Sequence, residues 1–231
     1  MVEKAIIEKR KPSMADKLNT LRAGVLGSND GILTVVGVLF SVAVATTDKF
    51  TIFIAGLADL LACAFSMASG EYASVSTQRD TEKAAVITEQ KLLKTDFAGE
   101  LDQVVSFYQK KGVSEQTSRE IALDLMKKKP LETIISVKYN LKLGSYLNPW
   151  NAAFSSLFSA ATGGIFPLAA MTLSPDGFKW QATILAVCFS VSLTGYLSAK
   201  LGNGLVKIAI FRNLIVGIVT MIIHYCIGIL L

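Results

Sequence analysis

Four side chains of types that bind metal ions recur at every fourth position of one strongly apolar segment. The segment is GLADLLACAFSMASGEYASV, residues 56–75, and the four residues are Asp59, Cys63, Met67 and Glu71. In a helix, steps of four residues advance about 400°, so these side chains form a stripe spread over about 120°. A carboxylate within a membrane span costs about 2.5–3.5 kcal/mol and usually faces a polar pathway or a partner.

The preceding apolar segment carries a second polar interruption, Asn29 and Asp30, in the sequence LGSNDGILTVVG. Taken with the stripe, this carboxylate favours a cation path over unrelated structural roles. The alternatives are that Cys63 and Met67 are packing residues and that Glu71 reaches out to the membrane surface. A lone histidine, His224, serves either in an exit or proton relay or as a packing residue.

The composition indicates the class of protein that must position these residues. The chain has 231 residues, is 52% hydrophobic and has a mean hydropathy of +0.48, which is typical of an integral membrane protein. A membrane span needs about 20 mostly apolar residues. Five segments qualify, and no strand pattern is found, so the sequence predicts an all-α protein. The five segments are roughly 25–46, 52–74, 152–173, 180–199 and 206–230.

The basic residues predict how the chain is oriented. Of the 23 Lys and Arg residues, only Lys49 and Lys179 fall on the side opposite to all the others. Because cytoplasmic loops carry the excess of Lys and Arg, residues 1–24 and 76–148 are predicted to be cytoplasmic. Residues 25–75 then hold the first two spans and residues 149–231 the last three. The net charge of +5 thus reflects topology and does not call for nucleic-acid binding.

The segment between the second and third spans is predicted to be a water-facing domain of three helices. Residues 75–95 keep helical spacing, as though the second span runs on beyond the membrane. Asp96 and Ser114 are predicted N-caps of the first two helices, and Pro130 ends the second. A third helix covers about 131–142.

Small residues inside the spans indicate close packing and a bend. Gly31 and Gly56 allow neighbouring helices to approach. Gly163, Gly164 and Pro167 lie inside the third span and predict a kink there. No cleavable signal peptide is expected, because the first apolar run is already long enough to span a membrane. No nucleophile–base pair is found, so the chain is not expected to be an enzyme.

At these residues the chain resembles the vacuolar iron transporter family. The matching segments run in order, with matching gaps, from about Leu21 to Gly228. They include VLGSNDGILTVVGVLFSVAVA, AGLADLLACAFSMASGEYASVSTQRDTEKA, NPWNAAFSSLFSAATGGIFPLAAM, TGYLSAKLGNG and FRNLIVGIVTMIIHYCIG. The resemblance implies five spans per protomer, a two-fold homodimer with the ion path between the copies, and a cytoplasmic metal-binding helical domain.

The resemblance also implies a function and a location. Fe²⁺, often Mn²⁺, is exported from the cytosol in exchange for protons, as substrate rather than cofactor. The multi-pass chain would lie in the cell membrane of a prokaryote or a vacuolar-type membrane of a eukaryote.

The residues that line the ion path in the family can be matched to positions of this sequence one by one. Asp30 and Met67 match translocation residues, Asp59 matches a position that accepts Glu in relatives, and Glu71 falls in the GEY motif at the mouth. Carboxylates suit Fe²⁺ and Mn²⁺, and a thioether favours Fe²⁺ over Mg²⁺ or Ca²⁺. Two-fold symmetry would double the few ligands of one chain. A carboxylate that releases its metal in a low dielectric tends to take up a proton, which is a route to antiport.

The cytoplasmic site departs from the family pattern. Glu89 and Glu100 match family ligands, but four of the six ligand positions hold residues that bind Fe²⁺ poorly. Those four are Leu92, Gln103, Ser136 and Asn140. Other residues with ligand chemistry lie nearby and would have to compensate: Asp80, Glu82, Asp96, Met126 and Glu132. The domain is therefore predicted to keep its fold but to bind metal weakly.

Other functions remain open on the residues alone. The same bundle would also suit Ni²⁺ or Co²⁺. An organic solute would require a roomier pocket with more aromatic lining than these spans offer. A membrane-anchored metal sensor or scaffold would require Asp30, Asp59 and Met67 to be dispensable.

Overall fold

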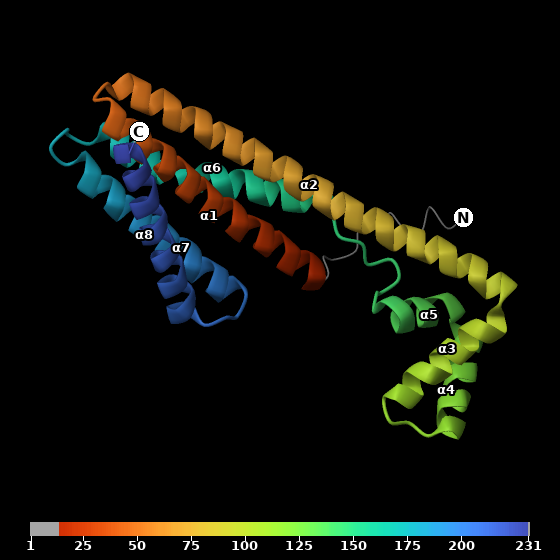
Figure 1. Ribbon diagram of the computed structural model, residues 1–231. Helices are drawn as coiled ribbons and strands as arrows, with labels where there is room; N and C mark the ends of the chain where they lie inside the picture. The colour runs from red at the N-terminus through yellow and green to blue at the C-terminus, as the bar shows by residue number, and fades with distance from the viewer. Residues whose placement is uncertain (1–13, 231) are drawn as a thin grey trace. The chain divides into compact units, whose positions relative to one another are not determined.

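The computed structural model describes residues 14–230, and this part of the chain contains eight α-helices and no strand (Figure 1). The helices are α1 (Met14–Ala45), α2 (Lys49–Thr95), α3 (Phe97–Lys110), α4 (Glu115–Lys128), α5 (Pro130–Tyr139), α6 (Pro149–Leu173), α7 (Lys179–Leu201) and α8 (Val206–Leu230). Five of them, α1, α2, α6, α7 and α8, are long and apolar enough to cross a membrane. The all-α prediction is confirmed, and these five candidate spans correspond to the five apolar segments predicted from the sequence.

The described chain divides into two compact units. The bundle unit comprises residues 14–75 and 148–230, and the insert unit comprises residues 76–147. Helix α2 contributes its first part to the bundle unit and its last part to the insert unit. The continuous α2 confirms the prediction that the second span runs on as a helix.

Helix α1 is the centre of the bundle unit. It packs against α6, α7 and α8, and α2 joins the same core through Ile52 and Leu60. Because α1 has neighbours on most sides, its buried face is a long apolar row. This row is Ile32, Val35, Val36, Leu39, Phe40 and Ala43.

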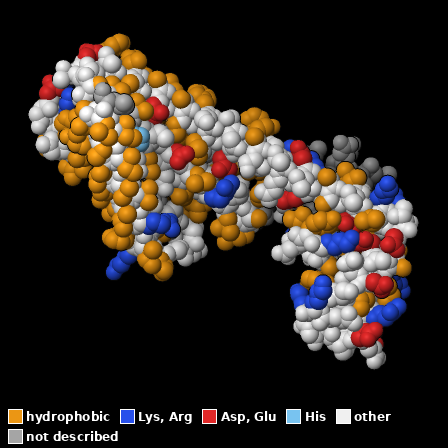
Figure 2. Space-filling view, viewed as in Figure 1, with side chains coloured by type: hydrophobic (Ala, Val, Ile, Leu, Met, Phe, Trp, Pro, Cys, Tyr) orange, Lys and Arg blue, Asp and Glu red, His pale blue; other side chains and the backbone are white. Residues whose placement is uncertain are grey.

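The outer surface of the bundle unit is apolar, as the bilayer requires. Figure 2 shows hydrophobic side chains covering the outer face of α8. Beyond its first two turns, where Lys207 and Arg212 are exposed, the exposed side chains of that helix are uncharged and mostly large and apolar, among them Ile215, Ile218, Ile222 and Ile223. In a water-soluble protein such a face would be an aggregation hazard, whereas lipid tails solvate it.

Helices α1 and α6 approach so closely that the backbones meet at glycines. A Cβ atom added to Gly31 would collide with the backbone carbonyl of Ala160, and one added to Gly27 with that of Ser156. From the other side, a Cβ on Gly164 would lie 2.6 Å from the carbonyl oxygen of Gly31. The glycines therefore set the distance between α1 and α6.

We expect Gly31→Ala to destabilise the bundle unit by about 1–3 kcal/mol, because α1 and α6 must move apart and their core contacts loosen. The matched control is Gly70→Ala in α2, where an added Cβ meets nothing within 4 Å. That change should be neutral or stabilising by up to about 1 kcal/mol, as helix propensity predicts. Thermal unfolding in detergent measures the change in stability of both variants. Equal unfolding temperatures for the two variants would contradict the packing interpretation.

The helix boundaries differ from the sequence prediction at two places. Helix α1 begins at Met14, well before the apolar run predicted from residue 25, because hydropathy detects the membrane-crossing part and not the polar turns before it. Helix α5 ends at Tyr139, and Asn140 follows in the left-handed conformation with φ 53°. An asparagine in that conformation ends the helix before residue 142.

In the insert unit, α3, α4 and α5 pack on the end of α2. The side chain of Asp96 accepts a hydrogen bond from the Gly99 amide, and that of Ser114 accepts one from the Thr117 amide. Both predicted N-caps are thus confirmed, and Pro130 lies in the first turn of α5. A small apolar core joins the helices, namely Val104, Val105, Ala122, Met126, Ile134 and Ile135.

Candidate functional site

Polar side chains of α1 and α2 meet on one face of the bundle unit. Asp30 is exposed in a single copy of the chain, and one turn later the Thr34 hydroxyl donates to the Asp30 carbonyl at 2.9 Å. The Thr34 side chain lies near the Cys63 thiol of α2, and Asp30 and Asp59 lie close enough for their charges to act on the same thiol. The structure therefore brings together Asp30, Asp59 and Cys63, to which Thr34 adds a hydroxyl that the sequence analysis missed.

The Asp59 carboxylate has an unsatisfied oxygen. Its Oδ2 atom is buried, and no hydrogen-bond partner is found for it in residues 14–230. A buried carboxylate oxygen without a donor is costly, since it loses water and gains nothing in return. A cation or a proton at this position would satisfy it, so the residues present fit a path for a cation.

The two remaining members of the stripe have different surroundings. Met67 is half-buried and lies one helical turn beyond Cys63. Glu71 is buried, and the Arg22 guanidinium of α1 donates to its Oε2 at 3.0 Å. Glu71 is thus neutralised by an arginine in one copy of the chain and does not join the Asp30–Asp59 group.

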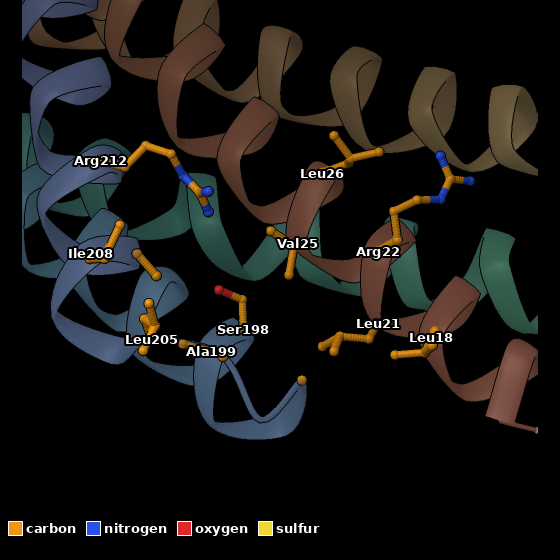
Figure 3. A pocket seen from close by; sticks show the side chains of 13 residues that line it. Leu18, Leu21, Arg22, Val25, Leu26, Ser198, Ala199, Leu205, Ile208 and Arg212 are labelled. Atoms are coloured by element: carbon orange, nitrogen blue, oxygen red, sulfur yellow. The ribbon is translucent and has the colours of Figure 1, made fainter.

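A pocket of about 490 Å³ opens between α1, α7 and α8 (Figure 3). Apolar side chains form most of its wall, and its two charged residues are Arg22 and Arg212. Figure 3 shows the Arg22 side chain extended toward α2, where it meets Glu71. Because no acidic residue lines its wall and Arg22 is paired with Glu71, this pocket offers no ligand for a cation.

Residues 14–230 of one copy do not supply a complete set of metal ligands. Within the described range, no group of three or more His, Cys, Asp or Glu side chains is placed to hold a metal ion. The Asp30–Asp59 face therefore provides part of a shell at most.

His224 of α8 packs against α1 rather than against the carboxylates. A Cβ atom added to Gly37 would lie 2.7 Å from the imidazole ring, so the absence of a side chain there makes room for it. The Ser41 hydroxyl donates to the His224 backbone carbonyl at 3.4 Å. This arrangement gives His224 a packing role, while a role in a proton relay remains a prediction.

In the insert unit, Glu89 of α2 and Glu100 of α3 converge on one ammonium group. Lys138 of α5 donates from Nζ to Glu89 Oε2 at 3.0 Å and to Glu100 Oε1 at 2.7 Å. The Tyr139 hydroxyl donates to Glu89 Oε1 at 2.8 Å. The two carboxylates are 1% and 5% exposed. A lysine therefore lies where the sequence analysis expected a weak metal site.

These contacts alter the protonation of the residues on α5. Burial of the Lys138 ammonium opposes its charge, but hydrogen bonds to Glu100 and Glu89 outweigh burial and raise its pKa above the usual value. The hydrogen bond to Glu89, followed by burial, raises the pKa of the Tyr139 hydroxyl. Both groups therefore keep their protons throughout the physiological range.

The other residues considered for a metal site in this unit do not join Glu89 and Glu100. Gln103 and Ser136 are exposed, and Asn140 ends α5. All five residues considered as compensating ligands have other contacts, among them Asp80, which lies 3.9 Å from Arg79, and Glu82, which accepts a hydrogen bond from Gln78 at 2.9 Å. Asp96 caps α3, Met126 is buried in the apolar core, and Glu132 pairs with Lys129 at 2.8 Å.

The sequence analysis overlooked Lys138, although a signal for it exists. Ile134 and Ile135 are fully buried, and Lys138 follows them by four and three residues. These spacings place Lys138 on the core-facing side of α5. A lysine at a core-facing position requires a buried acidic partner, and Glu89 and Glu100 are such partners.

Comparison with known proteins agrees with the resemblance. The model of the VIT family matches residues 21–229. The chain is 33% identical over 213 residues to a protein of Acanthamoeba castellanii named vacuolar iron transporter, which covers 91% of this chain and 78% of that protein. It is 27% identical over 198 residues to vacuolar iron transporter homolog 2.1 of Arabidopsis thaliana, covering 85% and 74%.

A third relative, vacuolar iron transporter homolog 1 of Oryza sativa, is 29% identical over 211 residues, covering 89% of this chain and 71% of the relative. The matched range covers all or most of each of the five apolar helices and contains the whole insert unit. A match of this extent does not arise from a shared motif alone, and we conclude that the chain belongs to the VIT family.

Proposed function

We propose that two copies of this chain together move Fe²⁺, and also Mn²⁺, out of the cytosol in exchange for protons. The observation that carries this proposal is the convergence of Asp30 and Asp59 with Cys63 on one face of the apolar bundle. The names of the relatives, which are vacuolar iron transporters, support iron as the cargo.

The exposure of Asp30 supports a second copy of the chain. A carboxylate that faces lipid tails costs several kcal/mol, roughly 2.5–3.5 on insertion scales, unless a polar partner covers it. An isologous dimer that uses this face would place Asp30 and Asp59 opposite their own copies and double the carboxylate oxygens. Such a shell suits Fe²⁺ or Mn²⁺, with Met67 as a soft additional ligand.

The unsatisfied oxygen of Asp59 supports proton exchange. When the metal leaves, the buried oxygen has no donor in the described chain, so taking up a proton is the least costly way to satisfy it. Metal release and proton uptake would then be linked at the same carboxylate. The excess of Lys and Arg supports a cytoplasmic position for the insert unit.

Purified protein in liposomes tests the cargo. We expect uptake of Fe²⁺ and Mn²⁺ well above that of protein-free vesicles, and weak competition by Mg²⁺ or Ca²⁺, because the thioether discriminates against them. Competition by Ni²⁺ and Co²⁺ in the same vesicles separates an iron transporter from a general one. Equal transport of Ca²⁺ and Fe²⁺ would contradict the assignment of Met67 as a ligand.

A further inference from the structure

The ion-pair cluster of the insert unit holds two buried carboxylates with one cation. Glu89 is fully satisfied, because Lys138 and Tyr139 between them donate to both of its oxygens. Glu100 receives one hydrogen bond at Oε1, while its Oε2 atom is buried with no partner among the described residues. The cluster thus carries two negative charges and one positive charge, and it joins three helices.

Such a cluster cannot exist without its cation. Buried carboxylates on neighbouring helices repel each other, and the loss of water makes each one costly on its own. Removing one partner of a buried ion pair is strongly destabilising for the same reason. The helices α2, α3 and α5 therefore need a positive charge at this point.

We propose that Lys138 is a tethered cation that holds Glu89 and Glu100 together in the place of a metal ion, so that the insert unit folds without bound metal. The ammonium is covalently attached to α5, so its local concentration does not depend on the metal content of the cell. This inference concerns the insert unit alone and does not rest on the proposed transport.

Geometry and charge both exclude a metal while the lysine is in place. Divalent cations bind carboxylate oxygens at about 2.0–2.6 Å, and the Lys138 nitrogen is 2.7–3.3 Å from the oxygens that it contacts. An ion between the two carboxylates would have to displace the ammonium and would be repelled by it. Gln103 and Ser136 are exposed and offer no replacement ligand in the core.

Replacing the lysine should therefore convert the cluster into a metal-dependent one. The Lys138→Met substitution removes the ammonium group. The carboxylates of Glu89 on α2 and Glu100 on α3, and the Tyr139 hydroxyl on α5, are all still present. The orphan Oε2 of Glu100 becomes available as a ligand. A divalent cation can then supply the missing charge.

Hydrogen exchange on the full-length protein, read by mass spectrometry over residues 86–105 and 130–142, tests the inference with Mn²⁺ as the probe. Metal in the bundle unit does not interfere, because these peptides report only on the insert unit. We expect wild type to exchange equally in chelator and in excess Mn²⁺. Lys138→Arg, which keeps the charge, should resemble wild type.

In chelator, the amides of these peptides should exchange at least about tenfold faster in Lys138→Met than in wild type. The reason is that local opening costs less free energy when two buried charges are unpaired. Excess Mn²⁺ should restore most of the protection. The double variant Lys138→Met with Glu100→Gln should not respond to Mn²⁺, and Lys110→Met, an exposed lysine of α3, should behave as wild type.

Several results would overturn the inference. Protection that depends on metal in wild type would show that the lysine does not replace the metal. An equal loss of protection from exchange in Lys138→Arg and Lys138→Met would show that the shape of the side chain matters and its charge does not. Unchanged protection in Lys138→Met would show that the cluster needs no cation. A Lys138→Met unit that Mn²⁺ fails to protect would show that the cluster is not a cation site.

Discussion

Asp30→Ala should abolish metal movement while leaving the protein folded. Asp30 is exposed in a single copy of the chain, so its removal should cost little stability. As a direct ligand it should matter more than an outer-shell partner, whose loss costs roughly 10–100-fold. Uptake of Fe²⁺ or Mn²⁺ into liposomes should therefore fall by at least about a hundredfold.

The control for this variant is Asp176→Ala. Asp176 is an exposed acid that pairs with Lys49 at 3.3 Å in the bundle unit, and an exposed pair contributes little to stability. Its transport should match that of wild type, and both variants should elute from a sizing column as wild type does. Metal uptake at the wild-type rate in purified Asp30→Ala would show that Asp30 is not part of the ion path.

The second large effect is expected for Asp59→Asn, which should uncouple transport from the pH gradient. An amide keeps the shape of the carboxylate and cannot take up a proton. If the buried oxygen of Asp59 carries the exchanged proton, an acidic lumen should no longer accelerate metal uptake. Metal binding should weaken less, because Asp30 and Met67 remain.

The measurement compares initial uptake rates with and without an imposed pH gradient, for wild type, Asp59→Asn and Asp59→Glu. The glutamate variant keeps a titratable group and should retain part of the gradient response. Full gradient-driven flux in Asp59→Asn would show that Asp59 is structural and that the proton is carried elsewhere, with His224 as the next residue to test.

Local sequence signals predicted most of the helices because each signal lies within a single helix or next to its end. Asp96, Ser114 and Pro130 were predicted at helix ends and lie there, since capping depends on the nearest backbone groups alone. Hydropathy found all five spans for the same reason. The start of α1 was missed, because its first turns are polar and carry no hydropathy signal.

The glycines of α6 show where local reasoning is insufficient. Gly163, Gly164 and Pro167 predicted a kink, which is a property of one helix. In the structure, Gly163 and Gly164 face α1, where added Cβ atoms would lie 2.7 Å and 2.6 Å from backbone oxygens. Their main effect is thus on helix packing, which depends on a partner more than a hundred residues away in the chain.

The candidate sites could be predicted only in part, because spacing within one helix is visible in the sequence and contacts between helices are not. A four-residue spacing placed Asp59 and Cys63 on one face, and the structure adds Asp30 and Thr34 from another helix. The same spacing placed Glu71 in the stripe, but its pairing with Arg22 is a contact between helices. Lys138 was overlooked because its role depends on Glu89 and Glu100 of two other helices.

Simultaneous recording of metal and proton movement in the same liposomes tests the transport proposal most directly. A luminal metal dye and a luminal pH dye would follow purified wild-type protein with an acidic lumen and external Fe²⁺ or Mn²⁺. We predict that metal enters as the lumen loses protons, that metal entry slows when an ionophore removes the pH gradient, and that neither signal occurs in Asp30→Ala. No metal uptake above that of protein-free vesicles under any gradient would contradict the proposal.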